Sequence, residues 1–179
     1  MTTMIRTKVI NDSTDLVTII RAFDSPIKKE VFTEISRDWT PSSMILTKFG
    51  DEGHDALEFF EKMKLAETKW TTPEEGVNGK PQKMYRSFYS LFSINISCPV
   101  NEISEIFNIS SLDNSSFEHL EEKIYDFIGD TGTFANKVSE NFHISNTALK
   151  ALVKRSNRFH YTGLKISRTP LFEATTKAF

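Results

Sequence analysis

The fold is decided by the stretch Thr133–Arg168, TFANKVSENFHISNTALKALVKRSNRFHYTGLKISR, whose pattern predicts a helix, a turn, a second helix and a hairpin. Hydroxyl side chains are favoured at helix starts, so Thr133 is predicted to cap the first helix and Ser145 the second. The second helix is expected from about Asn146 to Ser156. The first helix carries apolar residues at helical spacing: Phe134, Val138 and Phe142.

The second helix has two sides of different chemistry, because successive residues turn by about a hundred degrees. One side is apolar and is predicted to pack: Ala148, Leu149, Leu152 and Val153. The other side is predicted to be free to contact a partner: Asn146, Thr147, Lys150, Ala151 and Lys154, with Arg155 at the border.

A hairpin follows this helix. Thr162-Gly163 separates two strand-like segments, Phe159–Tyr161 and Leu164–Ser167, and glycine tolerates the positive φ of a tight turn. The hairpin is predicted to be the wing of a winged helix. The whole stretch carries a net charge of +6, with Glu140 as its single acid against seven basic residues: Lys137, Lys150, Lys154, Arg155, Arg158, Lys165 and Arg168.

A surface of this charge favours the backbone of double-stranded DNA as its partner. Residues at the start of the second helix are predicted to reach base edges: Asn146, Thr147 and Lys150. Ser145, the cap of this helix, is also predicted to belong to the DNA-binding site. Basic residues further along are predicted to hold phosphates: Lys154, Arg155, Arg158, Lys165 and Arg168. His160 fits either a phosphate contact or a stacked position in the hairpin. A solvated basic face on a structural helical hairpin is the alternative to all of these contacts.

The charge of the whole chain hides this segregation. The 179 residues carry a net charge of −2, because Asn101–Asp130 alone carries −7. The acidic helix in that segment is predicted to be solvated, or to orient the molecule on DNA or bind a basic partner. A single cysteine, Cys98, excludes an internal disulfide framework and fits a reducing compartment. Since no apolar run is long enough to span a membrane, we expect a soluble, cytoplasmic protein.

The first half of the chain predicts four helices after a loosely docked Met1–Ser13. Their predicted starts are Thr14 or Asp15, Ser25-Pro26, Thr40-Pro41 and about Glu52. Gly50 is predicted to stop the third helix, and the fourth is expected to end near Leu65. The fourth helix has an acidic outer face, which phosphates would repel, so it is predicted to be at most a minor DNA contact.

A long strand is predicted from about Gln82 to Cys98, ended by Pro99. A loop that joins it to Ala66–Trp70 is predicted to be a wing, with Lys80 and Lys83 near its tip. The aromatic residues of the strand either line a dimer surface or pack inside the first domain: Tyr85, Phe88, Tyr89 and Phe92.

The predicted fold class is mainly α with small antiparallel β-hairpins (α+β), arranged as two tandem winged helix-turn-helix domains. The first domain is expected at residues 14–99 and the second at residues 116–179. Residues 100–115 are predicted to hold a short connecting helix and a linker rich in Ser, Asn and Asp. Ser116 is predicted to cap the first helix of the second domain, which Gly129 ends.

No enzymatic chemistry is predicted. The four histidines lie far apart without metal-ligand spacing: His54, His119, His143 and His160. The sequence contains no phosphate-cradling glycine loop and no nucleophile motif. We therefore expect no cofactor and no metal.

Two passages carry a resemblance to a known family. FFEKMKLAETKW at Phe59–Trp70 and MYRSFYSLFSINISCP at Met84–Pro99 resemble archaeal winged-helix regulators of the ArsR family, and the likeness covers roughly Asp15–Pro99. The chain is similar to a euryarchaeal set that includes activators of the archaellum (motility) operon. Thr133–Arg168 separately resembles a second winged helix. The resemblance implies a homodimeric transcription regulator, but not metal sensing, because the paired cysteines of the metal sensors are missing.

The rival prediction is a protein-interaction module. In that case the acidic fourth helix contacts the transcription machinery and the second domain is merely basic, since a winged-helix fold does not by itself decide what is bound.

Overall fold

The computed structural model describes residues 5–71 and 81–170, and these form two compact units. The first unit is made of the described residues up to Val9 and of Ala22–Ile94. The second unit is made of Ile10–Arg21 and of the described residues from Asn95 onward. This division differs from the predicted boundaries, because residues 10–21 and the connecting segment 100–115 both pack within the second unit.

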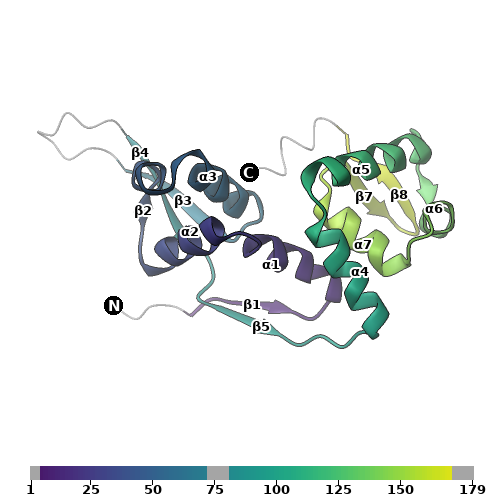
Figure 1. Ribbon diagram of the computed structural model, residues 1–179, viewed down its shortest axis with the longest axis horizontal. Helices are drawn as coiled ribbons and strands as arrows, with labels where there is room; N and C mark the ends of the chain where they lie inside the picture. Colours follow the sequence, from purple (N-terminus) through teal and green to yellow (C-terminus); the bar gives the residue numbers. More distant parts are fainter. Residues whose placement is uncertain (1–4, 72–80, 171–179) are drawn as a thin grey trace, which may run out of the picture. The chain divides into compact units, whose positions relative to one another are not determined.

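The first unit contains two helices and two small sheets, in purple to teal in Figure 1. Its helices and strands are β1 (Thr7–Ile10), α2 (Pro26–Arg37), β2 (Thr40–Pro41), α3 (Ser42–Lys62), β3 (Ala66–Thr71), β4 (Gln82–Ser87) and β5 (Leu91–Ile94). An antiparallel sheet has the order β2-β4-β3, and β1 pairs with β5 in a second sheet. The helices pack on the larger sheet around a core in which Leu57, Phe60 and Tyr85 are almost fully buried.

Several helix signals in the first unit are confirmed. Ser25 caps α2, since its hydroxyl oxygen accepts a hydrogen bond of 3.2 Å from the Lys28 backbone N–H. Gly50 breaks α3 as predicted, because it lies at φ 64° and ψ −156°, a conformation open essentially to glycine alone. Thr40-Pro41 forms β2, in which Thr40 pairs with Tyr85 of β4. Helix α3 begins directly after it, with Pro41 as the N-cap residue but no side-chain cap from Thr40.

The long strand predicted from Gln82 to Cys98 is wrong. The backbone N–H of Phe88 donates to the Leu65 carbonyl at 2.8 Å, and the Ser87 hydroxyl donates to the Tyr89 carbonyl at 2.7 Å. These bonds turn the chain between β4 and β5. Alternation of apolar and polar residues continues through the turn, which is why the pattern did not reveal it. The predicted wing tip with Lys80 lies outside the described residues.

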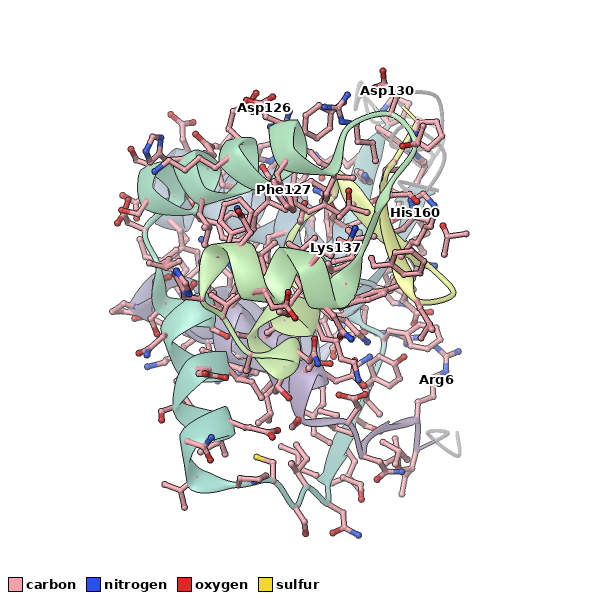
Figure 2. All side chains as sticks on the ribbon, turned by 90° about the vertical axis from the view of Figure 1, so that its right-hand side faces the viewer. Arg6, Asp126, Phe127, Asp130, Lys137 and His160 are labelled. Carbon is pink, nitrogen blue, oxygen red and sulfur yellow. The ribbon has the colours of Figure 1, made fainter. Side chains whose placement is uncertain are left out.

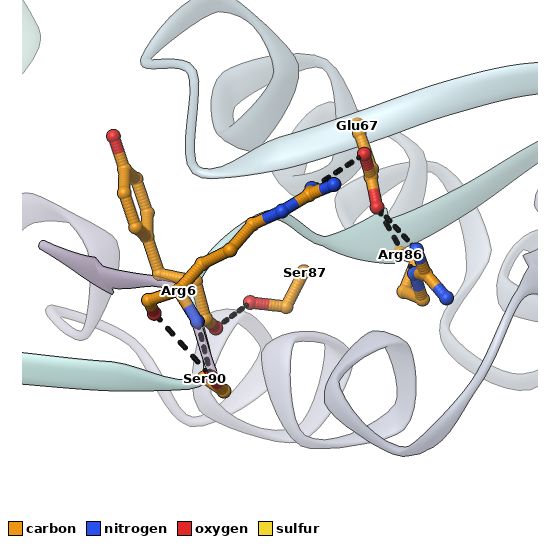
Figure 3. A network of polar contacts seen from close by, with 6 residues as sticks. Arg6, Glu67, Arg86, Ser87 and Ser90 are labelled. Carbon is orange, nitrogen blue, oxygen red and sulfur yellow. Dashed lines mark hydrogen bonds and ion pairs between the residues drawn. The ribbon is translucent and has the colours of Figure 1, made fainter. Parts of the chain in front are cut away.

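The expectation of a loosely docked N-terminus is also wrong for the described residues, because Thr7–Ile10 forms β1. Figure 3 shows how the start of this strand is held within the first unit. The Arg6 backbone exchanges hydrogen bonds with Ser90, and the Arg6 and Arg86 guanidinium groups both donate to the Glu67 carboxylate. Partial burial acts to raise the pKa of Glu67, but the hydrogen bonds from Arg86 and Arg6 outweigh it and lower that pKa.

The second unit contains the remaining helices of the described residues; in Figure 1, α1 is purple, and α4 to α7 with the last sheet run from green to yellow. After a 3₁₀ turn at Ser13–Asp15, the helices and strands of this unit are α1 (Leu16–Ala22), α4 (Val100–Ser111), α5 (Asn114–Ile128), β6 (Thr133–Phe134), α6 (Ala135–Phe142), α7 (Asn146–Arg155), β7 (Phe159–Thr162) and β8 (Lys165–Arg168). The antiparallel sheet has the order β6-β8-β7. Its core includes Val17, Ile106, Ile124, Leu149 and Ile166, all almost fully buried.

Three predicted details of the second unit need correction. Thr133 does not cap α6 but pairs with Ile166 in the sheet. Asp113, not Ser116, caps α5, because its carboxylate accepts from the Ser116 backbone N–H at 2.8 Å. The hairpin turns at Gly163-Leu164, one residue later than predicted, since Thr162 pairs with Lys165. Gly129 ends α5 as predicted.

Both units follow one order of elements. A helix leads to a short strand, then to two helical segments, then to a hairpin, and the short strand pairs with the second hairpin strand. The described residues thus form an α+β fold of seven α-helices with small antiparallel sheets, which is compatible with a winged helix. None of the helices among the described residues is long and apolar enough to cross a membrane.

Candidate nucleic-acid interface

The α7 helix holds the place of the second helical segment in the second unit, and its start is built as predicted. Ser145 accepts a hydrogen bond of 3.0 Å from the Ala148 backbone N–H. The turn before it places His143 in the left-handed region, at φ 53° and ψ 40°. Leu149 and Leu152 are fully buried in the core, which confirms the predicted packed side.

The predicted free side of α7 is narrower than the sequence indicates. Ala151, placed on that side, is fully buried, and Arg155 at the border is 6% exposed. The cause is α4, the predicted connecting helix, whose Ile106 and Ile109 share a core with Ala151. Helical spacing in the sequence shows which residues share a side of α7. It does not show that α4 covers a second side of the helix, next to the side that packs in the core.

Two residues of the predicted DNA-binding site make hydrogen bonds to α4. The Ser145 hydroxyl donates to Glu105, and the Thr147 hydroxyl donates to Glu102 at 2.8 Å. Both carboxylates lie at the N-terminal end of α7, where the partial positive charge of a helix favours them. In this arrangement Ser145 and Thr147 fix α7 against α4.

Arg155 is buried and contacts groups within the second unit. Its guanidinium group donates to the Ile109 carbonyl at 2.6 Å and lies 4.0 Å from the centre of the Phe117 ring. A buried guanidinium with such partners stabilises the end of α4 by satisfying backbone carbonyls. We therefore assign Arg155 to the packing of α4, α5 and α7.

Two further arginines predicted to hold phosphates contact α5. Arg158 pairs with Glu122, and Arg168 pairs with Asp130 and donates to the Tyr125 carbonyl at 2.9 Å. The hydrogen bond from Arg158 lowers the pKa of Glu122, and the same bond raises the pKa of Arg158. The acidic and basic segments that are separate in the sequence thus partly neutralise each other in the folded unit.

Three exposed residues remain along α7, one helical turn apart: Asn146, Lys150 and Lys154. We call them the α7 strip. Asn146 accepts a hydrogen bond of 3.0 Å from the Ser139 hydroxyl. Lys150 makes no hydrogen bond or ion pair with any described residue. The strip is the exposed part of α7 among the predicted site residues.

A groove of about 690 Å³ runs beside the α7 strip. The strip and the β7–β8 hairpin form its walls, and Phe134 stands at the start of α6. Tyr161, Leu164 and Phe134 are exposed at its rim. His160 lies in this groove, 3.5 Å from the Thr169 hydroxyl, and Figure 2 shows it on the hairpin. Lys165 lies outside the groove lining, with its ammonium group 5.2 Å from the centre of the Phe134 ring.

Two acidic residues beside the strip were missed by the sequence analysis. Asp12 lines the groove, and Asp15 makes an ion pair with Lys154. Hydrogen bonds from the hydroxyl and backbone N–H of Thr14 lower the pKa of Asp12, and the charges of Lys154 and Lys150 lower it further. The sequence does not reveal that these acids lie beside α7, because more than a hundred residues separate them from that helix.

The matching segment of the first unit, α3 after Gly50, has the opposite charge. Its exposed residues include four carboxylates and one lysine: Asp51, Glu52, Asp55, Glu58 and Lys62. Lys83, predicted near the wing tip, donates to Glu61 of the same helix at 2.6 Å. The acidic outer face predicted for this helix is confirmed. Within the described residues, no group of three or more His, Cys, Asp or Glu side chains could hold a metal ion.

Comparison with known proteins identifies the family. Residues 10–169 match the model of a family described as ArsR transcriptional regulator, which covers most of both units and extends beyond the resemblance at Asp15–Pro99. Neither the curated proteins nor the solved structures yielded a match. Because the family model spans nearly the whole chain, the protein belongs to the ArsR family of transcriptional regulators.

Proposed function

We propose that the chain is a sequence-specific DNA-binding transcription regulator whose second unit contacts double-stranded DNA through the α7 strip. The observation that carries this proposal is the exposure of Lys150 and Lys154 with Asn146, one turn apart, on the helix that holds the recognition position. Membership of the ArsR family supports the same role.

Each group of the strip has a chemical task. The Asn146 amide offers both a donor and an acceptor, which suits the edge of an adenine in the major groove. Lys150 and Lys154 supply positive charge for bases or phosphates, and Lys165 with His160 extends the contact along the hairpin. Ser145, Thr147, Arg155, Arg158 and Arg168 have partners within the unit, so we propose that they position the interface.

The shared order of elements supports a finer proposal, that both units are winged helix-turn-helix domains in tandem. The opposite charges of the two matching helices then imply different roles for the two domains. The basic second domain contacts DNA, while the acidic first domain serves another purpose, such as contact with a second copy or with the transcription machinery.

We also propose that the protein works in the cytoplasm as a homodimer. On the paired strands β1 and β5 and next to them, four apolar side chains of the first unit are each more than half exposed: Ile5, Val9, Leu91 and Ile94. Of the aromatic residues predicted for a dimer surface, Tyr85 is buried and Phe88 is 38% exposed, while Tyr89 and Phe92 pack against the core. Sedimentation equilibrium of the full chain tests the dimer.

Charge reversal tests DNA binding. Lys150→Glu with Lys154→Glu should weaken binding to a duplex obtained by in vitro selection by about 30-fold or more, measured by fluorescence anisotropy. The matched control is Lys62→Glu with Lys123→Glu, which makes the same change of net charge at exposed positions of α3 and α5. Equal affinities for the two double variants would contradict the proposed interface.

The second candidate is a protein-interaction module that contacts the transcription machinery. The apolar rim of the groove favours it, because Phe134 and Leu164 are 49% and 79% exposed and suit a protein surface. If Phe134→Ala with Leu164→Ala abolished capture of the transcription machinery while the lysine reversal left DNA affinity unchanged, this module would replace the first proposal.

The resemblance to archaellum regulators supports a last, finer proposal, that the regulated genes include those of the archaellum and that the protein activates them. Deletion of its gene in the host should lower archaellum transcripts. The wild-type chain should restore them, and the chain with the Lys150→Glu and Lys154→Glu changes should not. Unchanged transcripts would exclude this target but not DNA binding.

A further inference from the structure

The segment Ile10–Arg21 belongs to the second unit and packs into its core. Ile10, Thr14 and Val17 are each at most 2% exposed, and Val17 belongs to the core formed by α4, α5 and α7. Asp12 caps the 3₁₀ turn by accepting from the Thr14 backbone N–H at 2.8 Å. The positions of Asp12 and Asp15 are therefore fixed by packing from both ends of the turn.

This packing places two carboxylates beside the two lysines of the α7 strip. Asp15 pairs with Lys154, and Asp12 lines the same groove as Lys150 and Lys154. Two negative charges thus lie beside the two positive charges that the proposed function assigns to DNA contact. A duplex that approaches the strip has to displace Asp15 from Lys154 and is repelled by Asp12.

We propose that Asp12 and Asp15 are specificity-determining residues of this interface, which compete with DNA phosphates for Lys150 and Lys154. The proposal rests on the proposed function of the α7 strip. Binding to DNA of any sequence depends on cations that neutralise phosphates. The two acids lower that general affinity, so contacts to bases, such as those of Asn146, carry a larger share of the free energy of binding.

The decisive variant is Asp12→Asn with Asp15→Asn in the full chain. Asparagine keeps the side-chain oxygen that caps the 3₁₀ turn, so the variant removes charge and preserves the fold. The matched control is Glu118→Gln with Asp126→Asn, which removes two exposed charges from α5 of the same unit. Figure 2 shows Asp126 on the outer side of that helix.

The probe is a short duplex of random sequence, titrated by fluorescence anisotropy across a salt series. The Asp12 and Asp15 variant should bind about tenfold more tightly than wild type at low salt, because the ion pair of Asp15 with Lys154 and the nearby charge of Asp12 are both lost. Its plot of log affinity against log salt should steepen by about 1 to 2, as one or two more lysines neutralise phosphates. The α5 control should change affinity by less than about threefold, since its charges lie away from the strip.

Three results separate the failure of this inference from the failure of the proposed function. If the Lys150 and Lys154 reversal abolishes binding but the Asp12 and Asp15 variant binds with wild-type affinity and slope, the inference is wrong and the interface stands. If the α5 control gains as much affinity as the Asp12 and Asp15 variant, net charge explains the gain and the inference is again wrong. If neither reversal nor neutralisation affects binding, the α7 strip is not the interface and both proposals fail.

Discussion

Two helices hold the same place in the two units and have opposite surfaces. In the first unit, the α3 segment after Gly50 exposes four carboxylates and one lysine. In the second unit, α7 exposes an amide and two lysines, while its Ser145 and Thr147 bind carboxylates of α4. The same order of elements therefore carries two different surface chemistries, and the charge of the exposed side, not the fold, is the basis for proposing that α7 contacts DNA.

The largest expected effect concerns the last residue of each helix. Arg155→Ala should lower the free energy of unfolding of the second unit by about 3 kcal/mol, because the Ile109 carbonyl loses its donor and the contact with Phe117 is lost. Lys62→Ala, at the exposed end of α3, should change stability by less than about 0.5 kcal/mol.

Urea unfolding measures this difference, and the two probes separate the units. Both tryptophans, Trp39 and Trp70, lie in the first unit, so their fluorescence reports that unit, while far-ultraviolet circular dichroism reports both. The Arg155 variant should shift the dichroism transition and leave the fluorescence transition unchanged. A stable Arg155 variant would return this residue to the set of DNA contacts.

Arg155 also illustrates how far the sequence could predict the site. The bounds of α7 follow from local rules, because Ser145 is a strong cap and apolar residues repeat at helical spacing, and both are confirmed. The covering of α7 by α4 could not be predicted, because Glu105 and Glu102 lie 40 and 45 residues before their partners Ser145 and Thr147. The same holds for Asp12 and Asp15.

The fold shows a similar limit. The chain breaks at Gly50, Gly129 and Gly163 could be predicted from the sequence, because each residue has a positive φ angle, which glycine adopts most readily. The end of β4 was missed, because its cause is a hydrogen bond from Phe88 to Leu65, which no pattern within Gln82–Cys98 encodes. Local signals predicted some helix starts and ends, such as those at Ser25, Ser145 and Gly129, while distant contacts decided which faces are covered and where strands stop.

The second effect compares single charge reversals on the two helices. Lys150→Glu should weaken binding to the selected duplex by about tenfold, since an attraction becomes a repulsion at the interface. Glu58→Lys, on the exposed side of α3, should change it by less than about twofold if the first unit does not contact DNA. A large gain for the Glu58 variant, measured by anisotropy, would show that both helices approach DNA.

The third effect compares the turns before the two helices. Gly50→Ala should destabilise the first unit by about 2 kcal/mol through backbone strain alone, because a Cβ there meets no atom within 4 Å. His143→Gly should be neutral or stabilise the second unit by up to about 1 kcal/mol, since glycine accepts the left-handed conformation readily. Tryptophan fluorescence measures the first change and dichroism the second; a harmless Gly50 variant would contradict the strained turn.

The smallest effect is a pH dependence of stability. The hydrogen bonds from Ser116 lower the pKa of Asp113, and the bond from Arg158 lowers the pKa of Glu122. A lowered carboxyl pKa contributes stability that is present above the ordinary value and is lost as the pH falls through the folded value. Asp113→Asn with Glu122→Gln should therefore lose a few degrees less in Tm than wild type when the pH falls from about 5 to about 3. Equal losses would show that neither bond contributes.

The most direct test of the account asks which helix lies at the DNA. A DNA-cleaving chelate is attached to a single cysteine in a Cys98→Ser background, either through Asn157→Cys, exposed just beyond the α7 strip, or through Glu58→Cys on α3. If α7 lies at the DNA, cleavage of the selected duplex should be localised from position 157 and absent above background from position 58. Cleavage from position 58 without cleavage from position 157 would contradict this expectation and assign DNA contact to the first unit.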